Sequence, residues 1–127
     1  MIQSIDRYQE RIAFGMPPRF WLKWLDHDNR LRIDMATDSQ GDIWRFTIQY
    51  ETGIEGRWYP VVRCDTAHNE AHIDYLDPAG VEYLKRMLRL TEPYNSTLTL
   101  IEESFAQTWS THRQRFMQQW RETHSND

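Results

Sequence analysis

The feature that most constrains the fold of this chain is an alternation of apolar and polar residues between positions 29 and 51. This period of two is typical of β-strands with one buried and one wet face. The apolar positions of two successive strands are Leu31, Ile33, Met35, Trp44, Phe46, Ile48 and Tyr50. A loop of turn-forming residues at 37–41 separates the strands, so we expect them to pair antiparallel and to need a cover on their apolar face.

A long amphipathic helix, predicted at residues 96–122, can supply that cover. Pro93 ends the preceding segment, and Asn95 is a suitable N-cap. The apolar spacing in this segment is 3-4-4-3-4-4, which places one stripe of side chains on one helical face: Leu98, Ile101, Phe105, Trp109, His112, Phe116 and Trp120. We interpret the whole stripe as core, including His112, rather than as an aromatic platform for bases or a metal ligand.

The rest of the chain predicts shorter elements. Residues 2–14 have the spacing of a short helix, and strands are expected at 57–67 and 72–76. Residues 19–25 fit a helical face about as well as a buried strand, and residues 81–92 are equally ambiguous. Together these patterns predict one α+β domain over the whole chain. Its architecture is an antiparallel β-meander of 4–5 strands, covered on one face by the long C-terminal helix, with a short N-terminal helix.

Composition limits the functions open to this domain. The 127 residues include six Trp, six Tyr and five Phe, enough for a bulky core, while 27% charged residues indicate a polar exterior. No apolar run reaches the ~20 residues of a membrane span, and the first residues do not resemble a signal peptide. The net charge of −4 disfavours a broad basic surface for nucleic acid. The lone Cys64 agrees with a reducing compartment, so we predict a cytoplasmic protein and interpret Cys64 as a small buried hydrophobe.

Most of the reactive side chains lie between Arg63 and Asp74. If Asn69 and Glu70 are the two central turn residues of a hairpin, Asp65 faces Asp74. One surface then carries Arg63, Asp65, His72 and Asp74, while His68 lies on the other face or in the turn. Two opposed carboxylates repel each other by about 0.2–1 kcal/mol, which a cation, a shared proton or the neighbouring arginine would offset.

Three interpretations of this hairpin stay open on the residues alone. In the first, His72 and one aspartate exchange protons with a substrate and Arg63 stabilises negative charge, as metal-independent phosphodiester transfer requires. In the second, His68, His72 and the aspartates bind a divalent ion, although His-x3-His spacing is typical of a helix. In the third, the charges form a surface ion network and the histidines cap a turn. We rank metal last, expect no cofactor or metal, and take as candidate catalytic residues Arg63, Asp65, His68, His72 and Asp74.

The same run resembles the signature of an uncharacterised prokaryotic domain family. Its members carry R-Y-D-T-A-H-G-x-x-H-x-D and then D-P-x-G, which the segments 63–74 and 77–80 approach. Cys64 replaces the usual aromatic residue, and Asn69, which also tolerates left-handed backbone, replaces a glycine. Tyr94 and the residues that follow it also look like this family, so the resemblance covers residues 42–120. It implies a β-meander with a C-terminal helix and no established activity.

More distantly, the segment resembles the D-N-A-containing stretch of TumE-type toxins from toxin–antitoxin pairs. These are small, meander-like proteins supposed to act on RNA, and the resemblance implicates Arg63, Asp65, His68 and His72. It implies a nucleic-acid-processing protein with an RNA substrate and an antitoxin-like partner. The net acidity and the many aromatic residues favour an alternative, a non-enzymatic binding or accessory module that forms a homodimer.

Overall fold

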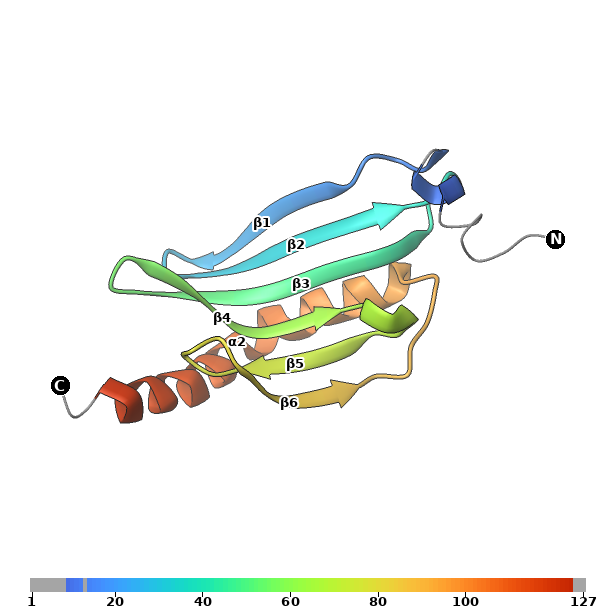
Figure 1. The fold of residues 1–127 in the computed structure, drawn as a ribbon. Coiled ribbons are helices and arrows are strands. Elements are labelled where there is room, and N and C mark those ends of the chain that lie inside the picture. The colour runs from blue at the N-terminus through green and yellow to red at the C-terminus, as the bar shows by residue number, and fades with distance from the viewer. Residues whose placement is uncertain (1–8, 13, 125–127) are drawn as a thin grey trace.

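A six-stranded antiparallel sheet forms the centre of the computed structural model, which describes residues 9–12 and 14–124 (Figure 1). The strands are β1 (Arg19–Asp26), β2 (Asn29–Thr37), β3 (Ile43–Ile54), β4 (Arg57–Asp65), β5 (His72–Leu76) and β6 (Glu82–Met87). They lie in the sheet in the order in which they occur in the sequence. The predicted α+β meander is therefore confirmed, with six strands in place of the expected 4–5.

The additional strands come from the two segments whose type the sequence left open, β1 and β6. Both lie at an edge of the sheet, where each pairs with a single neighbour. Every residue of β6 is exposed, and most of β1 is exposed as well. Edge strands bury little surface, so their sequences carry a weak period-two signal. That is why periodicity alone did not separate strand from helix here.

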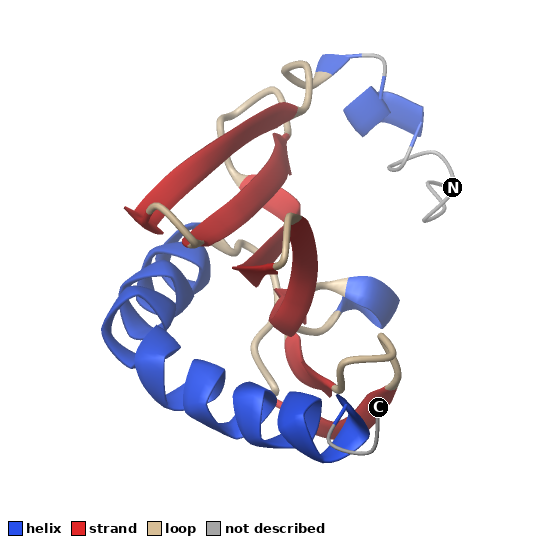
Figure 2. Cartoon of the chain, turned by 90° about the vertical axis from the view of Figure 1, so that its left-hand side faces the viewer, coloured by secondary structure: helices blue, strands red, loops and turns tan. Residues whose placement is uncertain are grey.

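The long helix α2 (Asn95–His124) covers one face of the sheet, as predicted. Figure 2 shows it curving along one side, with the short 3-10 helix η1 (Ala67–Asn69) on the other. Most of the predicted stripe is buried or packed against the core: Leu98, Ile101, Phe105, Trp109, Phe116 and Trp120. Asn95 begins the helix, but its Oδ1 accepts a hydrogen bond from the backbone N–H of Ile43 at 2.9 Å. The Asn95 side chain therefore ties the start of α2 to β3.

The core lies between α2 and the alternating apolar face of the sheet. Leu31, Ile33, Ile48 and Tyr50 are fully buried there, as the pattern predicts. Trp44 departs from the pattern because the register between β2 and β3 shifts at Ala36 and Thr37, close to its position. Trp44 is only half-buried, and Arg11 and Arg45 lie over its ring.

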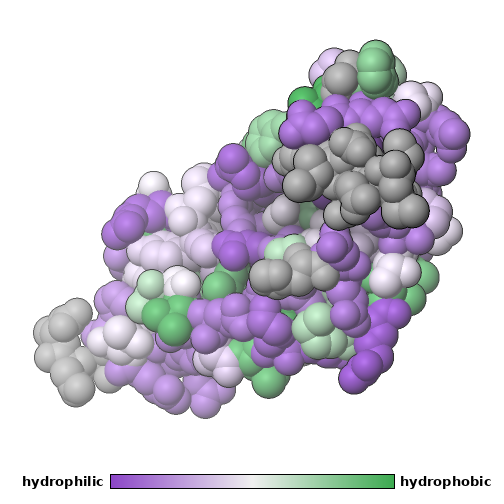
Figure 3. Space-filling model, turned by 45° about the vertical axis from the view of Figure 1, so that its right-hand side comes forward, coloured by the Kyte–Doolittle hydropathy of each residue, from purple (hydrophilic) through white to green (hydrophobic). Residues whose placement is uncertain are grey.

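The short N-terminal helix is present at residues 9–12. The backbone N–H of Gly15 donates to the carbonyl oxygen of Arg11 at 2.9 Å, which closes its last turn. Of the predicted helix, residues 2–8 and 13 lie outside the described part of the chain. Within the described part of the chain, no helix is long and apolar enough to cross a membrane. The side of the molecule in Figure 3 is largely hydrophilic, with hydrophobic residues in separate patches.

Candidate functional site

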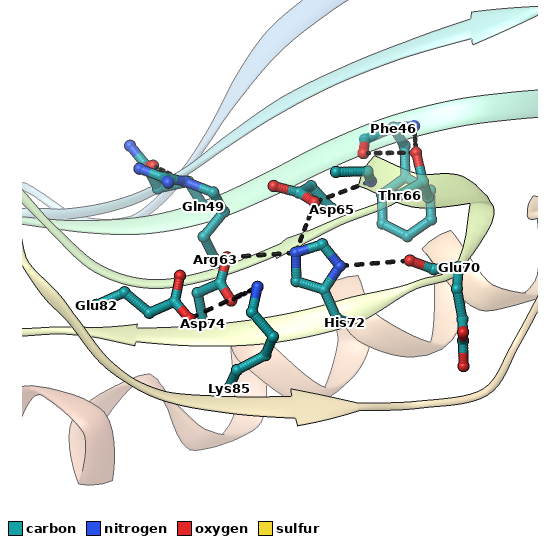
Figure 4. Close-up of polar contacts among 11 residues, drawn as sticks. Phe46, Gln49, Arg63, Asp65, Thr66, Glu70, His72, Asp74, Glu82 and Lys85 are labelled. Atoms are coloured by element: carbon teal, nitrogen blue, oxygen red, sulfur yellow. Dashed lines mark hydrogen bonds and ion pairs between the residues drawn. The ribbon is translucent and has the colours of Figure 1, made fainter.

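The hairpin of β4 and β5 brings four candidate residues to the face of the sheet opposite α2 (Figure 4). Arg63 pairs with Asp74, and Asp65 pairs with His72. Because side chains alternate along a strand, the intervening Cys64 points to the other face and joins the helix-covered core. The prediction that Arg63, Asp65, His72 and Asp74 share one surface is consistent with this register.

The predicted pairing within that surface was wrong. Asp65 faces His72, and not Asp74, because the connection is longer than a two-residue turn and contains η1. Asn69 ends η1 with φ of 64°, the left-handed conformation that asparagine tolerates. The longer connection slides the register by two residues. A slip of two preserves the face of every side chain, whereas a slip of one would have reversed it.

His72 lies at the centre of the cluster and is only 3% exposed. Its Nε2 is 2.9 Å from Oδ1 of Asp65 and 3.4 Å from Oδ2 of Asp74. Its Nδ1 is 3.3 Å from the carbonyl oxygen of Glu70. Asp74 is also buried, whereas the side chain of Asp65 keeps 22% of its surface exposed. Both ring nitrogens therefore face oxygen acceptors, and one of the two carboxylates reaches solvent.

Lys85 is a member of the site that sequence reasoning missed. Its Nζ lies 2.9 Å from Oδ1 of Asp74 and 3.5 Å from Oε1 of Glu82. The hydrogen bond to Asp74 is the main reason why the pKa of Lys85 is raised. Lys85 belongs to β6, and only the pairing of β6 with β5 places it opposite Asp74. Recognising residues 81–92 as a strand would have found it.

Arg63 makes its side-chain hydrogen bond outside the cluster of Asp65, His72 and Asp74. Its Nε donates to Oε1 of Gln49 at 2.7 Å. The amide nitrogen of Gln49 in turn donates to Glu51, which also accepts from Arg30. Arg63 therefore belongs to a polar network that crosses β2, β3 and β4, and Lys85 is the ammonium group that neutralises Asp74.

Two further residues of the motif are Cys64, in β4, and His68, in η1. Cys64 is fully buried, and desolvation raises the pKa of its thiol to about 12, so the thiolate is strongly disfavoured. This agrees with its interpretation as a buried hydrophobe. His68 lies in η1, within the turn, and its side chain falls outside what the structure describes.

Solvent reaches the cluster through Asp65. This residue lines a hollow of about 320 Å³ together with Arg45, Thr66 and other residues of β3 and η1. Oδ1 of Asp65 also accepts a hydrogen bond from the backbone N–H of Ala67 at 3.1 Å, which orients the carboxylate. A ligand in the hollow would meet one carboxylate of the cluster directly, with His72 behind it.

This arrangement permits two kinds of chemistry. The partly exposed carboxylate, backed by a buried imidazole, could exchange a proton with a bound hydroxyl group. Alternatively, Asp65, His72 and Asp74 could hold a cation, because their nitrogen and oxygen donors all lie within 4.8 Å of one another.

Comparison with protein families identifies the chain as a member of a domain of unknown function, DUF7718, whose model matches residues 8–122. This confirms an uncharacterised domain family and extends the match beyond the segment that carried the resemblance. It provides no link to TumE-type toxins. The chain matches no curated protein and no solved structure.

Proposed function

We propose that this member of the DUF7718 family is a toxin-like, nucleic-acid-processing protein of the prokaryotic cytoplasm. In this proposal, Asp65, His72 and Asp74 form the site that cleaves RNA. The observation that carries the proposal is the partly exposed Asp65 carboxylate, which lines the hollow and is held by a buried histidine 2.9 Å away. An exposed base with a fixed orientation is the first requirement of phosphodiester transfer.

In the proposed reaction, Asp65 takes the proton of a ribose 2′-hydroxyl group. The 2′-oxygen then forms a bond to phosphorus, the bond to the 5′-oxygen breaks, and that oxygen takes a proton from solvent. His72 and Asp74 are positioning residues, since His72 contacts both carboxylates. Arg45 lines the same hollow and can stabilise the charge that develops on the phosphate.

The free face of the sheet also offers a surface that suits single-stranded RNA. Arg30 lies over the rings of Trp58 and Trp24, 3.9 and 5.5 Å from their centroids, and Arg32 lies 4.8 Å from that of Phe20. Phe20 and Trp24 are each 54% exposed. Since Arg30 is already paired with Glu51, the exposed rings of Phe20 and Trp24 are the surfaces on which bases can stack, and the exposed Arg32 is the charge that can bind a phosphate.

Cleavage of a 5′-labelled single-stranded RNA tests the proposal. The protein should cut the RNA, and Asp65→Asn should reduce the rate by about 100-fold or more, in line with the loss of a general base. Glu103→Gln is the control, because Glu103 is an exposed carboxylate on α2, on the other side of the sheet from the cluster and the hollow. Equal rates for both variants, or no cleavage by the unaltered protein, would overturn the proposal.

The alternative proposal is a non-enzymatic accessory module that binds a second copy of the chain. Large exposed hydrophobic residues on and beside β6 favour it: Val81, Tyr83, Leu84, Met87 and Leu90. An antitoxin-like partner could use the same edge. Light scattering after gel filtration decides the dimer version, because a mass equal to one chain would exclude it.

A further inference from the structure

We infer that Asp65, His72 and Asp74 form a binding site for one divalent transition-metal ion such as Mn²⁺. The geometry of the three side chains carries the inference of binding. A role of this ion in cleavage rests on the part of the proposed function that assigns an RNA substrate to this site, and Asp65 would then be a ligand of the ion instead of the base.

The spacing of the donor atoms is that of ligands around a shared ion. An ion about 2.1 Å from each donor would keep adjacent donors about 3.0–3.4 Å apart. Nε2 of His72 is 2.9 Å from Oδ1 of Asp65 and 3.4 Å from Oδ2 of Asp74. All three donors lie within 4.8 Å of one another, so small rotations of the carboxylates complete the site (Figure 4).

The second nitrogen of His72 has the partner that metal-binding histidines need. Nδ1 lies 3.3 Å from the carbonyl oxygen of Glu70, which can only accept a hydrogen bond. In a neutral ring, the proton on Nδ1 leaves a lone pair on Nε2, which then points between two carboxylates. A cation on Nε2 removes this repulsion, as does a proton there, which would donate to Asp65. A hydrogen bond from the distal nitrogen to a backbone carbonyl also fixes the ring for coordination.

The charges of the cluster leave room for a cation. The two carboxylates face one ammonium group, because Lys85 contacts Oδ1 of Asp74 while Arg63 is engaged by Gln49. Lys85 thus orients Asp74 and leaves Oδ2 directed at His72. Asp65 forms the open side of the site, with the hollow beyond it. Waters or a phosphate oxygen could fill the remaining coordination positions there.

The donor set indicates the kind of ion. Two carboxylate oxygens suit hard ions such as Mg²⁺ and Mn²⁺, whereas one imidazole favours transition metals over Mg²⁺. Mn²⁺ accepts both donor types, and its free form gives a strong electron paramagnetic resonance signal. The ligand set differs from the one considered on sequence grounds, since it consists of one histidine and two aspartates and does not need His68.

Titration of metal-free protein with Mn²⁺, followed by the resonance of the free ion, tests the site. We expect one Mn²⁺ per chain for the unaltered protein and for Glu103→Gln, whose altered side chain lies on α2, away from the cluster. Asp65→Asn should bind at least tenfold more weakly, since loss even of an outer-shell partner costs 10–100-fold. Asp65 is partly exposed, so this variant should fold, and its circular dichroism spectrum and melting temperature check that it does.

A second measurement locates the ion. Mn²⁺ below one equivalent should broaden the ring signals of His72 in nuclear magnetic resonance spectra before those of His27 and His124, which are exposed. Equal affinity of both variants, several weak sites, or no binding would overturn the inference. Binding without RNA cleavage would refute only the proposed function, whereas cleavage by a protein that binds no Mn²⁺ in the titration would refute only the metal site.

Discussion

His112 provides a sensitive test of how α2 packs against the sheet. Its ring lies among the rings of Tyr75 and Phe105, and its Nδ1 lies 3.2 Å from Nη1 of Arg115. Burial, reinforced by the positive charge of Arg115, lowers the pKa of His112 from 6.5 to about 4. We therefore consider how much a fall in pH lowers the free energy of unfolding, and compare this loss between the unaltered protein and His112→Gln.

The expected size follows from the two pKa values. As the pH falls through 6.5, the ring in the unfolded chain takes up a proton, whereas the ring in the folded chain stays neutral until about pH 4. The unfolded state therefore binds more protons between these values, and acid favours unfolding. This contribution to stability is complete above pH 6.5 and is lost progressively down to about pH 4. At pH 5 the loss amounts to about 2 kcal/mol.

Urea unfolding at pH 7 and pH 5 measures the effect. The free energy of unfolding should fall by about 2 kcal/mol more for the unaltered protein than for His112→Gln. Taking the difference between the two proteins cancels the titration of other groups, including the Asp65, His72 and Asp74 cluster. His124→Gln, at the exposed end of α2, should retain the full pH dependence. Equal losses for His112→Gln and the unaltered protein would show that His112 is not buried against the sheet.

Three further predictions concern other parts of the fold. Phe116→Ala should cost about 3–5 kcal/mol in urea unfolding, because the ring is fully buried, whereas Leu100→Ala on the exposed face of α2 should change stability by less than about 0.5 kcal/mol. Cys64 should react with a thiol reagent only as fast as the protein unfolds, and rapid labelling of the native protein would contradict its burial. Gly15→Ala should lower stability by about 1–3 kcal/mol, since a Cβ there would lie 2.6 Å from the carbonyl oxygen of Thr37, and an unchanged midpoint in urea would refute this contact.

The sequence predicted the central elements well because their burial is periodic. β2, β3 and α2 each bury one face, so the apolar spacing alone fixes their type. The sequence did not identify β1 and β6 as strands, because these edge strands are mostly exposed and need no buried apolar face. Asn95 was predicted as the N-cap before a helix at 96–122; it is instead the first residue of α2, and its side chain accepts a hydrogen bond from Ile43, a contact between residues 52 positions apart that local sequence patterns cannot predict.

The sequence predicted which side chains of β4 and β5 share one surface, but it did not predict which of them pair across the two strands. Alternation along β4 and β5 is local, so Arg63, Asp65, His72 and Asp74 were assigned to one surface from the sequence. Their pairing depends on the length of the connection, which η1 extends. Lys85 could not be assigned, because its place opposite Asp74 requires a strand that periodicity did not reveal.

The position of Nε2 of His72 links the two proposals for this site. A proton and a metal ion cannot occupy this lone pair together, so proton-based and ion-based chemistry exclude each other at His72. With a proton, His72 can donate to both carboxylates, and Asp65 is the base that generates a 2′,3′-cyclic phosphate. With an ion, His72, Asp65 and Asp74 would be its ligands, and it would supply Lewis-acid chemistry toward a phosphate oxygen or a water molecule. Cyclic phosphate ends formed in the presence of chelator would therefore favour the proton, and cleavage that requires Mn²⁺ and yields linear phosphate ends would favour the ion.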